Sequence, residues 1–133
     1  MQEDNLLDEK EEYVHQNQVL KAFITTRVKM LTENVNNKFN IAEFKLFNQL
    51  VNGELEETCV TTVEGVEYSG GLNNAARINV GLDIINTLSQ HYKITAPIFI
   101  DNAESITDII PTEAQQIQLI VSGQDENLRM ETI

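Results

Sequence analysis

The first 52 residues contain neither glycine nor proline, and this absence constrains the fold more than any other feature of the sequence. Apolar residues between Leu6 and Val35 recur mostly three, four or seven positions apart, which is the period of an amphipathic helix. Asn36 and Asn37 then supply a stop signal. A helix of about 30 residues spans roughly 45 Å. Because a small domain does not need this length, we expect part of the helix to project or to pair with another helix, and its first turns to fray.

The chain has 133 residues, enough for one domain with a core, and a formal net charge of -12. Such a surface repels a polyanion, so we expect no nucleic-acid binding through this chain itself. The single Cys59 excludes an internal disulfide, and the first four residues, Met-Gln-Glu-Asp, are the opposite of a basic signal sequence. No apolar run is long enough to cross a bilayer. These features predict a cytoplasmic chain without a membrane partner.

Beyond the long helix, the apolar period changes to alternation. Residues 44–51 lead into Asn-Gly at 52–53, and a run rich in β-branched residues follows at 55–63. Asn-Gly between two such runs predicts a hairpin whose two central residues both take positive φ. Glu-Gly at 64–65 predicts a second tight turn, with residues 66–68 briefly extended after it.

The second half of the sequence alternates between helical and extended patterns. The loop sequence Ser-Gly-Gly at 69–71 precedes a helical apolar stripe over residues 73–90. A short apolar strand at 98–100 ends at an aspartate, another is expected at 116–121, and a last one at 128–133. Both of the first two strands are nearly continuous apolar runs, which is typical of strands buried in a parallel sheet.

This order of elements predicts an α/β fold. One long, coiled-coil-like N-terminal helix occupies residues 1–37. A C-terminal lobe, residues 38–133, combines a β-hairpin with a short, mostly parallel sheet and helices.

Asp101 is the candidate with the clearest chemistry, because a carboxylate at the end of a buried strand lies where open α/β sheets bind ligands. It is suited to Mg²⁺, which takes few protein carboxylates and keeps several waters. The alternative is that Asp101 or Asn102 simply caps the next helical turn, and the local residues support both interpretations equally. His15 and His91 are too far apart in the sequence to predict a zinc site.

Several segments, in order, resemble the SMC, RecN and SbcC-type ATPases. Residues 72–82 (Leu-Asn-Asn-Ala-Ala-Arg-Ile-Asn-Val-Gly-Leu) resemble the signature segment, in which a Leu-Ser-Gly-Gly-Glu-Arg-like run opens a helix. The strand that ends at Asp101, about 24 residues later, resembles Walker B. Residues 105–108 resemble the D-loop and residues 121–128 the switch strand. The likeness covers residues 38–133, is greatest to phage-type members, and makes the long helix the descending coiled-coil arm.

The resemblance implies a role for each matching residue. Asp101 would bind Mg²⁺ in a complete head, and Ser105 and Asp108 would belong to the D-loop. The signature-like residues that would close over the nucleotide of an opposite head are Asn73, Asn74, Ala75 and Arg77. Taken without the resemblance, Arg77 is an ordinary exposed helical arginine that is only solvated, which is the interpretation we favour. Tyr68 and Tyr92 are expected to pack at the ends of the same helix.

The sequence also departs from the family pattern. Asn73, Asn74 and Ala75 replace the signature serine and glycines, whereas the Ser-Gly-Gly at 69–71 is out of register with the helix. Asn102 stands where the catalytic glutamate is expected and cannot accept a proton from water, while Glu104 lies two positions further on. The switch histidine is replaced by Gly-Gln at 123–124, and the chain holds no Gly-x-x-x-x-Gly-Lys-Ser/Thr phosphate loop.

From these observations we expect the chain to be the C-terminal part of a composite ATPase head. Such a head would serve DNA repair, recombination or DNA organisation. The isolated chain should be inactive, with Mg²⁺ and ATP bound only in a complete head, and DNA contacted only by the full complex. The alternatives are a hydrolysis-deficient nucleotide-binding or dimerising module and a purely structural coiled-coil protein. Exposed apolar residues on the first helix and an unpaired sheet edge predict a homodimer, or a partner that supplies the phosphate-loop lobe.

Overall fold

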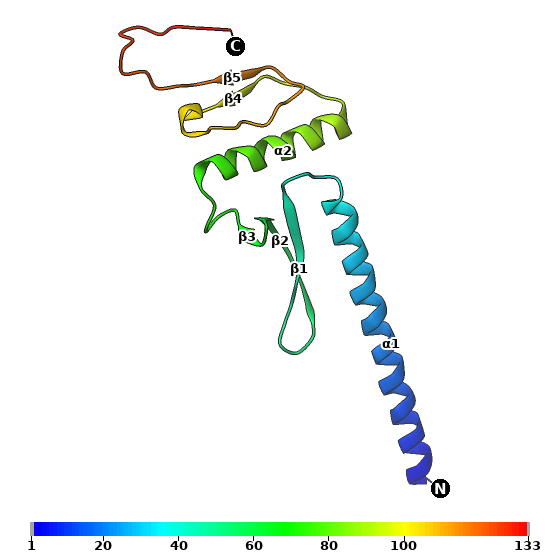
Figure 1. Cartoon of the computed structure of the whole chain (residues 1–133). Helices are drawn as coiled ribbons and strands as arrows, with labels where there is room; N and C mark the ends of the chain where they lie inside the picture. The colour runs from blue at the N-terminus through cyan, green and yellow to red at the C-terminus, as the bar shows by residue number, and fades with distance from the viewer. Residues whose placement is uncertain (1, 133) are drawn as a thin grey trace.

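The computed structural model describes residues 2–132, with side chains from residue 6 onward. Its elements confirm an α/β fold with a long N-terminal helix, an antiparallel sheet and a small parallel sheet. In chain order they are α1 (Gln2–Asn36), β1 (Glu43–Gln49), β2 (Leu55–Val63), β3 (Val66–Glu67), α2 (Asn74–Tyr92), β4 (Ile98–Ile100), the 3-10 helix η1 (Ala103–Ser105) and β5 (Gln116–Gln118). Figure 1 shows α2 between the parallel sheet on one side and the antiparallel sheet with the end of α1 on the other.

α1 projects from the rest of the chain, as its length predicted (Figure 1). It is already helical at Gln2, although the sparse apolar residues there predicted a frayed start. It ends at Asn36, at the predicted stop signal, and the Asn36 amide explains how this end is held. The Asn36 side chain accepts a hydrogen bond from Phe44 N at 2.8 Å and donates one to Phe44 O at 3.2 Å, which joins α1 to β1. Within residues 2–132 no helix is long and apolar enough to cross a membrane.

β1 and β2 form the predicted hairpin, but the predicted turn class is wrong. Of Asn52 and Gly53 only the glycine has positive φ (81°). Gly53 N donates to Leu50 O at 2.9 Å and Leu50 N donates to Glu54 O at 2.8 Å, which is the pattern of a three-residue loop with a bulge at the glycine. The Asn52 side chain explains the difference, since its oxygen accepts a hydrogen bond from Glu54 N at 3.0 Å.

The tight two-residue turn lies instead between β2 and β3. Glu64 (φ 49°) and Gly65 (φ 79°) both have positive φ, and Val63 and Val66 pair directly on either side of them. Here the glutamate takes the left-handed conformation that is usual for asparagine or glycine. The predicted turn at 64–65 and the extended residues after it are therefore confirmed.

α2 begins and ends close to the predicted bounds of 73–90. Asn73 is its N-cap residue, because the Asn73 side-chain oxygen accepts a hydrogen bond from Ala76 N at 2.8 Å. Residues 69–71 form a turn outside the helix, as the register argument required. At the other end Lys93 takes the left-handed conformation (φ 55°), and its N–H donates to Ser89 O.

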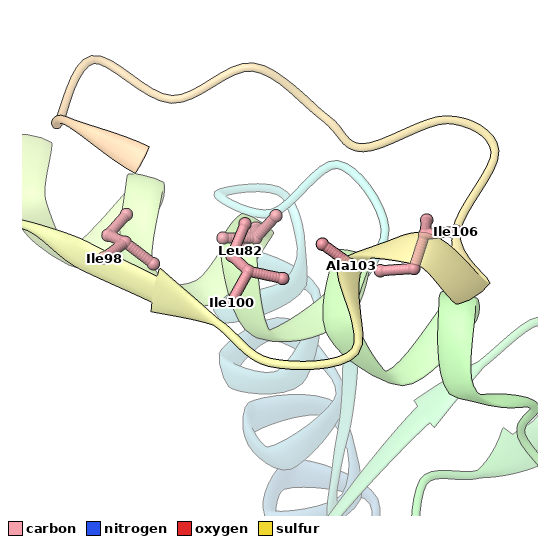
Figure 2. Packing of buried hydrophobic residues seen from close by; sticks show 5 residues of the cluster. All are labelled: Leu82, Ile98, Ile100, Ala103 and Ile106. Carbon is pink, nitrogen blue, oxygen red and sulfur yellow. The ribbon is translucent and has the colours of Figure 1, made fainter. Parts of the chain in front are cut away.

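The main core lies between α2 and the parallel sheet (Figure 2). Leu82 belongs to the predicted apolar stripe of α2 and is buried there, whereas Ile85 and Leu88 of the same stripe are exposed. Val80 and Asp83 are fully buried. The predicted stripe is confirmed at Leu82, and at Ala75 and Ile78, which pack against the same core. α2 also buries Asp83, which was not predicted, because the helix lies between two layers. The buried cluster consists of Leu82, Ile98, Ile100, Ala103 and Ile106.

The late strands are parallel, as predicted, but they are shorter than predicted and fewer of their side chains are buried. β4 and β5 pair over three residues each, and residues 119–121 lie beyond the end of β5. No strand forms over residues 128–132, so the predicted last strand is wrong within the described residues. Phe99 is 67% exposed and Ile120 is 56% exposed, in contrast to the predicted burial of both runs. Only the face of β4 that carries Ile98 and Ile100 is covered, because α2 packs against that face alone.

Candidate functional site

The predicted signature-like and D-loop-like segments lie side by side. Asn74, on the first turn of α2, donates a side-chain hydrogen bond to Ser105 Oγ at 2.7 Å, across a separation of 31 residues. Ser105 Oγ in turn donates to Asn102 O at 2.8 Å, at the turn that follows β4. The fold therefore brings together three of the predicted site residues in one chain of hydrogen bonds.

Asp101 follows the last residue of β4, as predicted. Its carboxylate is exposed and accepts a hydrogen bond from Asn102 N at 3.0 Å. Asn102 has the N-cap position of η1 and a left-handed backbone (φ 58°), but its side chain makes no capping bond, so a side-chain cap by Asn102 is wrong. Among the described residues no group of three His, Cys, Asp or Glu side chains gathers around a common point. A lone carboxylate still suits Mg²⁺ when substrate phosphates and water supply the other ligands.

The remaining predicted residues divide between the surface and the interior. Glu104 and Asp108 are exposed, and the structure uses only the backbone carbonyl of Asp108, which accepts a bond from Asn79. Ala75 packs against the buried cluster, so its side chain points toward the sheet. Asn73 is exposed, with its side-chain oxygen engaged as the N-cap of α2. Asn73 therefore caps the N-terminus of the signature-like helix.

Arg77 is not the solvated surface arginine that we favoured. Its side chain is half-buried, its guanidinium lies 5.8 Å from the centre of the Tyr68 ring, and its Nε is buried without a hydrogen-bond partner. Attraction between the cation and the ring face holds Tyr68 beside the first turn of α2. Tyr92, at the other end of the helix, is 64% exposed and lies edge-on to His91. Tyr68 therefore packs at its end of α2 as predicted, and Tyr92 does so only on its neighbour.

Two asparagines that the sequence did not single out hold the loop between η1 and β5 against α2. Asn79 donates to Asp108 O at 2.8 Å and accepts from Ile110 N at 3.1 Å, so its amide pairs with the loop backbone in both directions. Asn86 donates to Pro111 O at 3.0 Å. The sequence feature that could have identified them is their spacing, because residues seven positions apart lie on the same face of a helix.

Asp83 is a further residue that the sequence did not single out. It is 1% exposed, and its carboxylate accepts hydrogen bonds from the backbone N–H groups of Asn40, Ile41 and Ala42. Burial by itself raises the pKa of Asp83, but the bonds from Ala42, Ile41 and Asn40 outweigh it, so the pKa lies below its ordinary value. The available signal was a lone acidic residue inside the apolar run 80–85 of a helix.

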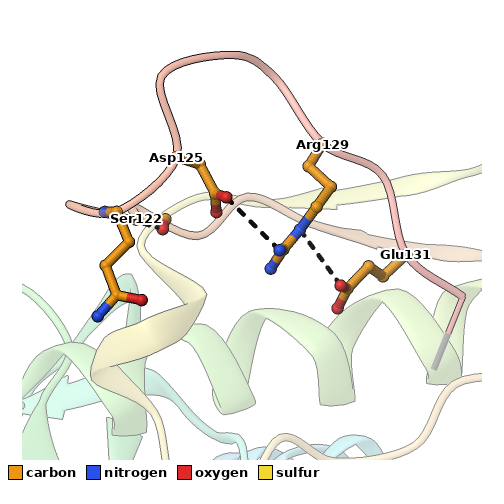
Figure 3. Close-up of polar contacts among 5 residues, drawn as sticks. Ser122, Asp125, Arg129 and Glu131 are labelled. Carbon is orange, nitrogen blue, oxygen red and sulfur yellow. Dashed lines mark hydrogen bonds and ion pairs between the residues drawn. The ribbon is translucent and has the colours of Figure 1, made fainter.

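The switch-like segment at residues 121–128 is exposed along its length. Figure 3 shows the polar contacts at this end of the chain. Gln124, which stands in the place of the switch histidine, donates its backbone N–H to Ser122 Oγ at 3.4 Å. Arg129 connects the end of the segment through contacts to Asp125 at 3.5 Å and Glu131 at 3.2 Å. These contacts are all local to the segment and its immediate neighbours, in contrast to the long-range bond between Asn74 and Ser105.

Comparisons with known proteins add no family assignment. No protein-family model matches the chain, and no curated protein or solved structure matches it. A functional assignment therefore rests on the motifs of the sequence and on the geometry of the site.

Proposed function

We propose that this chain is the C-terminal lobe of an SMC-like ATPase head. It would supply the signature-like helix, the Walker-B-like strand and the D-loop-like turn to a composite head. A separate lobe would supply the phosphate loop that this sequence lacks. In this role the chain works in DNA repair, recombination or DNA organisation and does not turn over ATP alone.

The hydrogen bond between Asn74 and Ser105 is the observation that carries the proposal. The sequence resemblance assigned these two residues to different motifs, 31 positions apart, without any reference to their contact in space. A composite head needs both motifs at one edge so that they can face the same nucleotide. The start of α2 also directs backbone N–H groups toward that edge, which favours a phosphate there.

The open parallel sheet also supports a missing lobe. β4 pairs only with β5, so its other edge exposes unpaired backbone groups within the described residues. Phe99, on the uncovered face, and Ile120, just beyond β5, both expose more than half of their side chains. Parallel sheets are ordinarily covered on both faces. A second lobe that continues the sheet would pair the edge and cover these apolar side chains.

The chemistry expected of the complete head depends on the residues at the end of β4. When Mg²⁺ and ATP are bound, the metal neutralises phosphate charge, and Asp101 is the residue that would hold it, directly or through water. Asn102 cannot act as the general base. Glu104 is exposed two positions further on, in η1, and is the nearest carboxylate in the sequence that could orient a water.

A hydrolysis-deficient nucleotide-binding module is the second candidate function. It is favoured by Asn102 in the place of the glutamate and by Gln124 in the place of the histidine. A structural coiled-coil protein is the third candidate, and the exposed side chains of α1 favour it. The three differ in whether Mg²⁺-ATP binds at all and in whether it is consumed.

The decisive experiment uses the chain together with a captured polypeptide that carries a phosphate loop. The chain alone should neither bind nor hydrolyse Mg²⁺-ATP in equilibrium dialysis and phosphate release. The complex should hydrolyse ATP, and Asp101→Ala should abolish turnover, whereas the surface variant Glu113→Ala, at an exposed carboxylate outside the matching motifs, should not. Binding without turnover would favour the second candidate. Turnover by the isolated chain that is lost in Asp101→Ala would refute the requirement for a second lobe.

A further inference from the structure

α1 exposes every side chain from residue 6 to residue 27. In a soluble protein most of the stability of a helix comes from packing its apolar face, and propensity alone supports a helix only weakly. The described part of this chain provides no packing for these turns. Another helix alongside α1 would provide it.

Five of the exposed apolar side chains of α1 share one face, which we call the α1 stripe. Its members are separated by seven, seven, four and seven positions, a spacing that keeps them in line along a helix and is typical of coiled-coil contact positions. Each is between 42% and 64% exposed. The α1 stripe consists of Leu6, Tyr13, Leu20, Ile24 and Leu31.

Charge is segregated along the same helix. Residues 8–12 hold four acidic side chains and one lysine. Residues 13–32 hold no acidic side chain, and their cations are Lys21, Arg27 and Lys29. The acidic segment lies at one end of the α1 stripe, and two of the three cations, Arg27 and Lys29, lie toward its other end.

We propose that α1 pairs with α1 of a second copy of this chain in an antiparallel orientation. In the register that aligns the two stripes, Leu6 lies opposite Leu31 of the second copy, and Tyr13 lies opposite its Ile24. The paired length is about 38 Å at 1.5 Å per residue. The same register places residues 8–12 of each copy, which hold four acidic side chains and one lysine, beside residues 25–29 of the other, which hold Arg27 and Lys29.

The charges of the two segments favour the antiparallel orientation, and Arg27 is the cation of residues 25–29 that lies nearest the stripe. It lies on the same face as the stripe, three positions after Ile24 and four before Leu31. In the antiparallel register Lys10 of the second copy lies opposite Arg27 and Glu9 lies beside it, so the long Arg27 side chain has to turn its guanidinium away from the ammonium group and toward the carboxylate. A parallel pair would place Arg27 against Arg27 and the acidic segment against itself, which is unfavourable. Antiparallel pairing of α1 does not depend on the ATPase proposal.

Disulfide trapping tests the orientation. Leu6→Cys and Leu31→Cys are made separately in a Cys59→Ser background, because Cys59 is exposed and would cross-link by itself. Mixing the two variants under oxidising conditions should give a disulfide-linked dimer that contains one chain of each. Each variant alone should give none. Cross-linking of either variant with itself would indicate parallel pairing and overturn the proposal.

Charge reversal tests the contacts in solution. Glu9→Arg should weaken the dimer at least about tenfold in sedimentation equilibrium, because Arg27 of the second copy would then face two cations, at positions 9 and 10, at both ends of the pair. Glu11→Arg carries the same charge change on the opposite face and should change the affinity by less than about threefold at physiological salt. Glu9→Arg combined with Arg27→Glu should restore the dimer. A wild-type chain that stays monomeric at all concentrations, or equal effects of the two single variants, would overturn the proposal.

Discussion

The carboxylate of Asp83 lies 2.9 Å from the backbone nitrogen of Ala42, although the two residues are 41 positions apart. Asp83 is in the middle of α2, and Ala42 is in the connection between α1 and β1. The same carboxylate also accepts hydrogen bonds from Asn40 N and Ile41 N. One buried side chain therefore joins the helix that carries the candidate site to the base of the projecting helix.

Replacing Asp83 should destabilise the whole chain. Asp83→Ala leaves three backbone N–H groups of the α1–β1 connection without their acceptor, and we expect a loss of about 2–4 kcal/mol in the free energy of unfolding. Asp83→Asn keeps one acceptor oxygen and should cost about half as much. Urea unfolding followed by far-UV circular dichroism measures both. The exposed Asp101→Asn variant is the control, expected to stay within about 0.5 kcal/mol of wild type.

The stability that Asp83 contributes should disappear in acid. Its pKa is lowered on folding, so its contribution is fully present above the ordinary aspartate pKa of about 4 and is lost as the pH falls through the folded pKa. We expect the difference in unfolding free energy between wild type and Asp83→Asn to be constant from about pH 5 to pH 7 and to shrink below about pH 4. A difference that grows on acidification would contradict the lowered pKa.

The contact between Asn74 and Ser105 should be energetically small and measurable. Both side chains are exposed, so we expect a coupling of about 0.5–1 kcal/mol in a double-mutant cycle of Asn74→Ala and Ser105→Ala. The pair Asn74→Ala and Thr112→Ala is the matched control and should be additive. Additivity in the first cycle would mean that the two segments are held together by the apolar core alone.

Replacing Lys93 by glycine should stabilise the chain. Its left-handed backbone at the end of α2 (φ 55°) is strained for a residue with a side chain, and glycine is the residue that most favours this position. We expect Lys93→Gly to raise the free energy of unfolding by about 0.5–1 kcal/mol. Ser89→Gly, one turn earlier in the helix, should lower it by about 1 kcal/mol. A lower free energy of unfolding in both variants would show that the Lys93 side chain has a stabilising contact.

Helix boundaries followed closely from the sequence because the signals that set them are local. The absence of glycine and proline before residue 53, and the asparagines at residues 36 and 73, act on their immediate neighbours. The turn at 64–65 and the strand that ends before Asp101 followed for the same reason. The start of α2 at Asn74 was also close to its predicted position, whereas Ser105 was placed only by its resemblance to a D-loop residue.

Tertiary structure alone decided the features that depend on distant residues. The buried Asp83 needs three N–H groups about 41 positions away, and the hydrogen bonds of Asn79 need a loop about 30 positions away, so the local pattern around each residue does not identify its partners. The exposure of Phe99 was not predictable either, because an apolar run is the same whether or not a second layer covers it. Sequence by itself determined the ends of the two helices and the turn at 64–65, because those boundaries are set by backbone preferences and short-range hydrogen bonds. Only the packing of α2 between two layers decided which polar side chains are buried and which apolar ones remain uncovered.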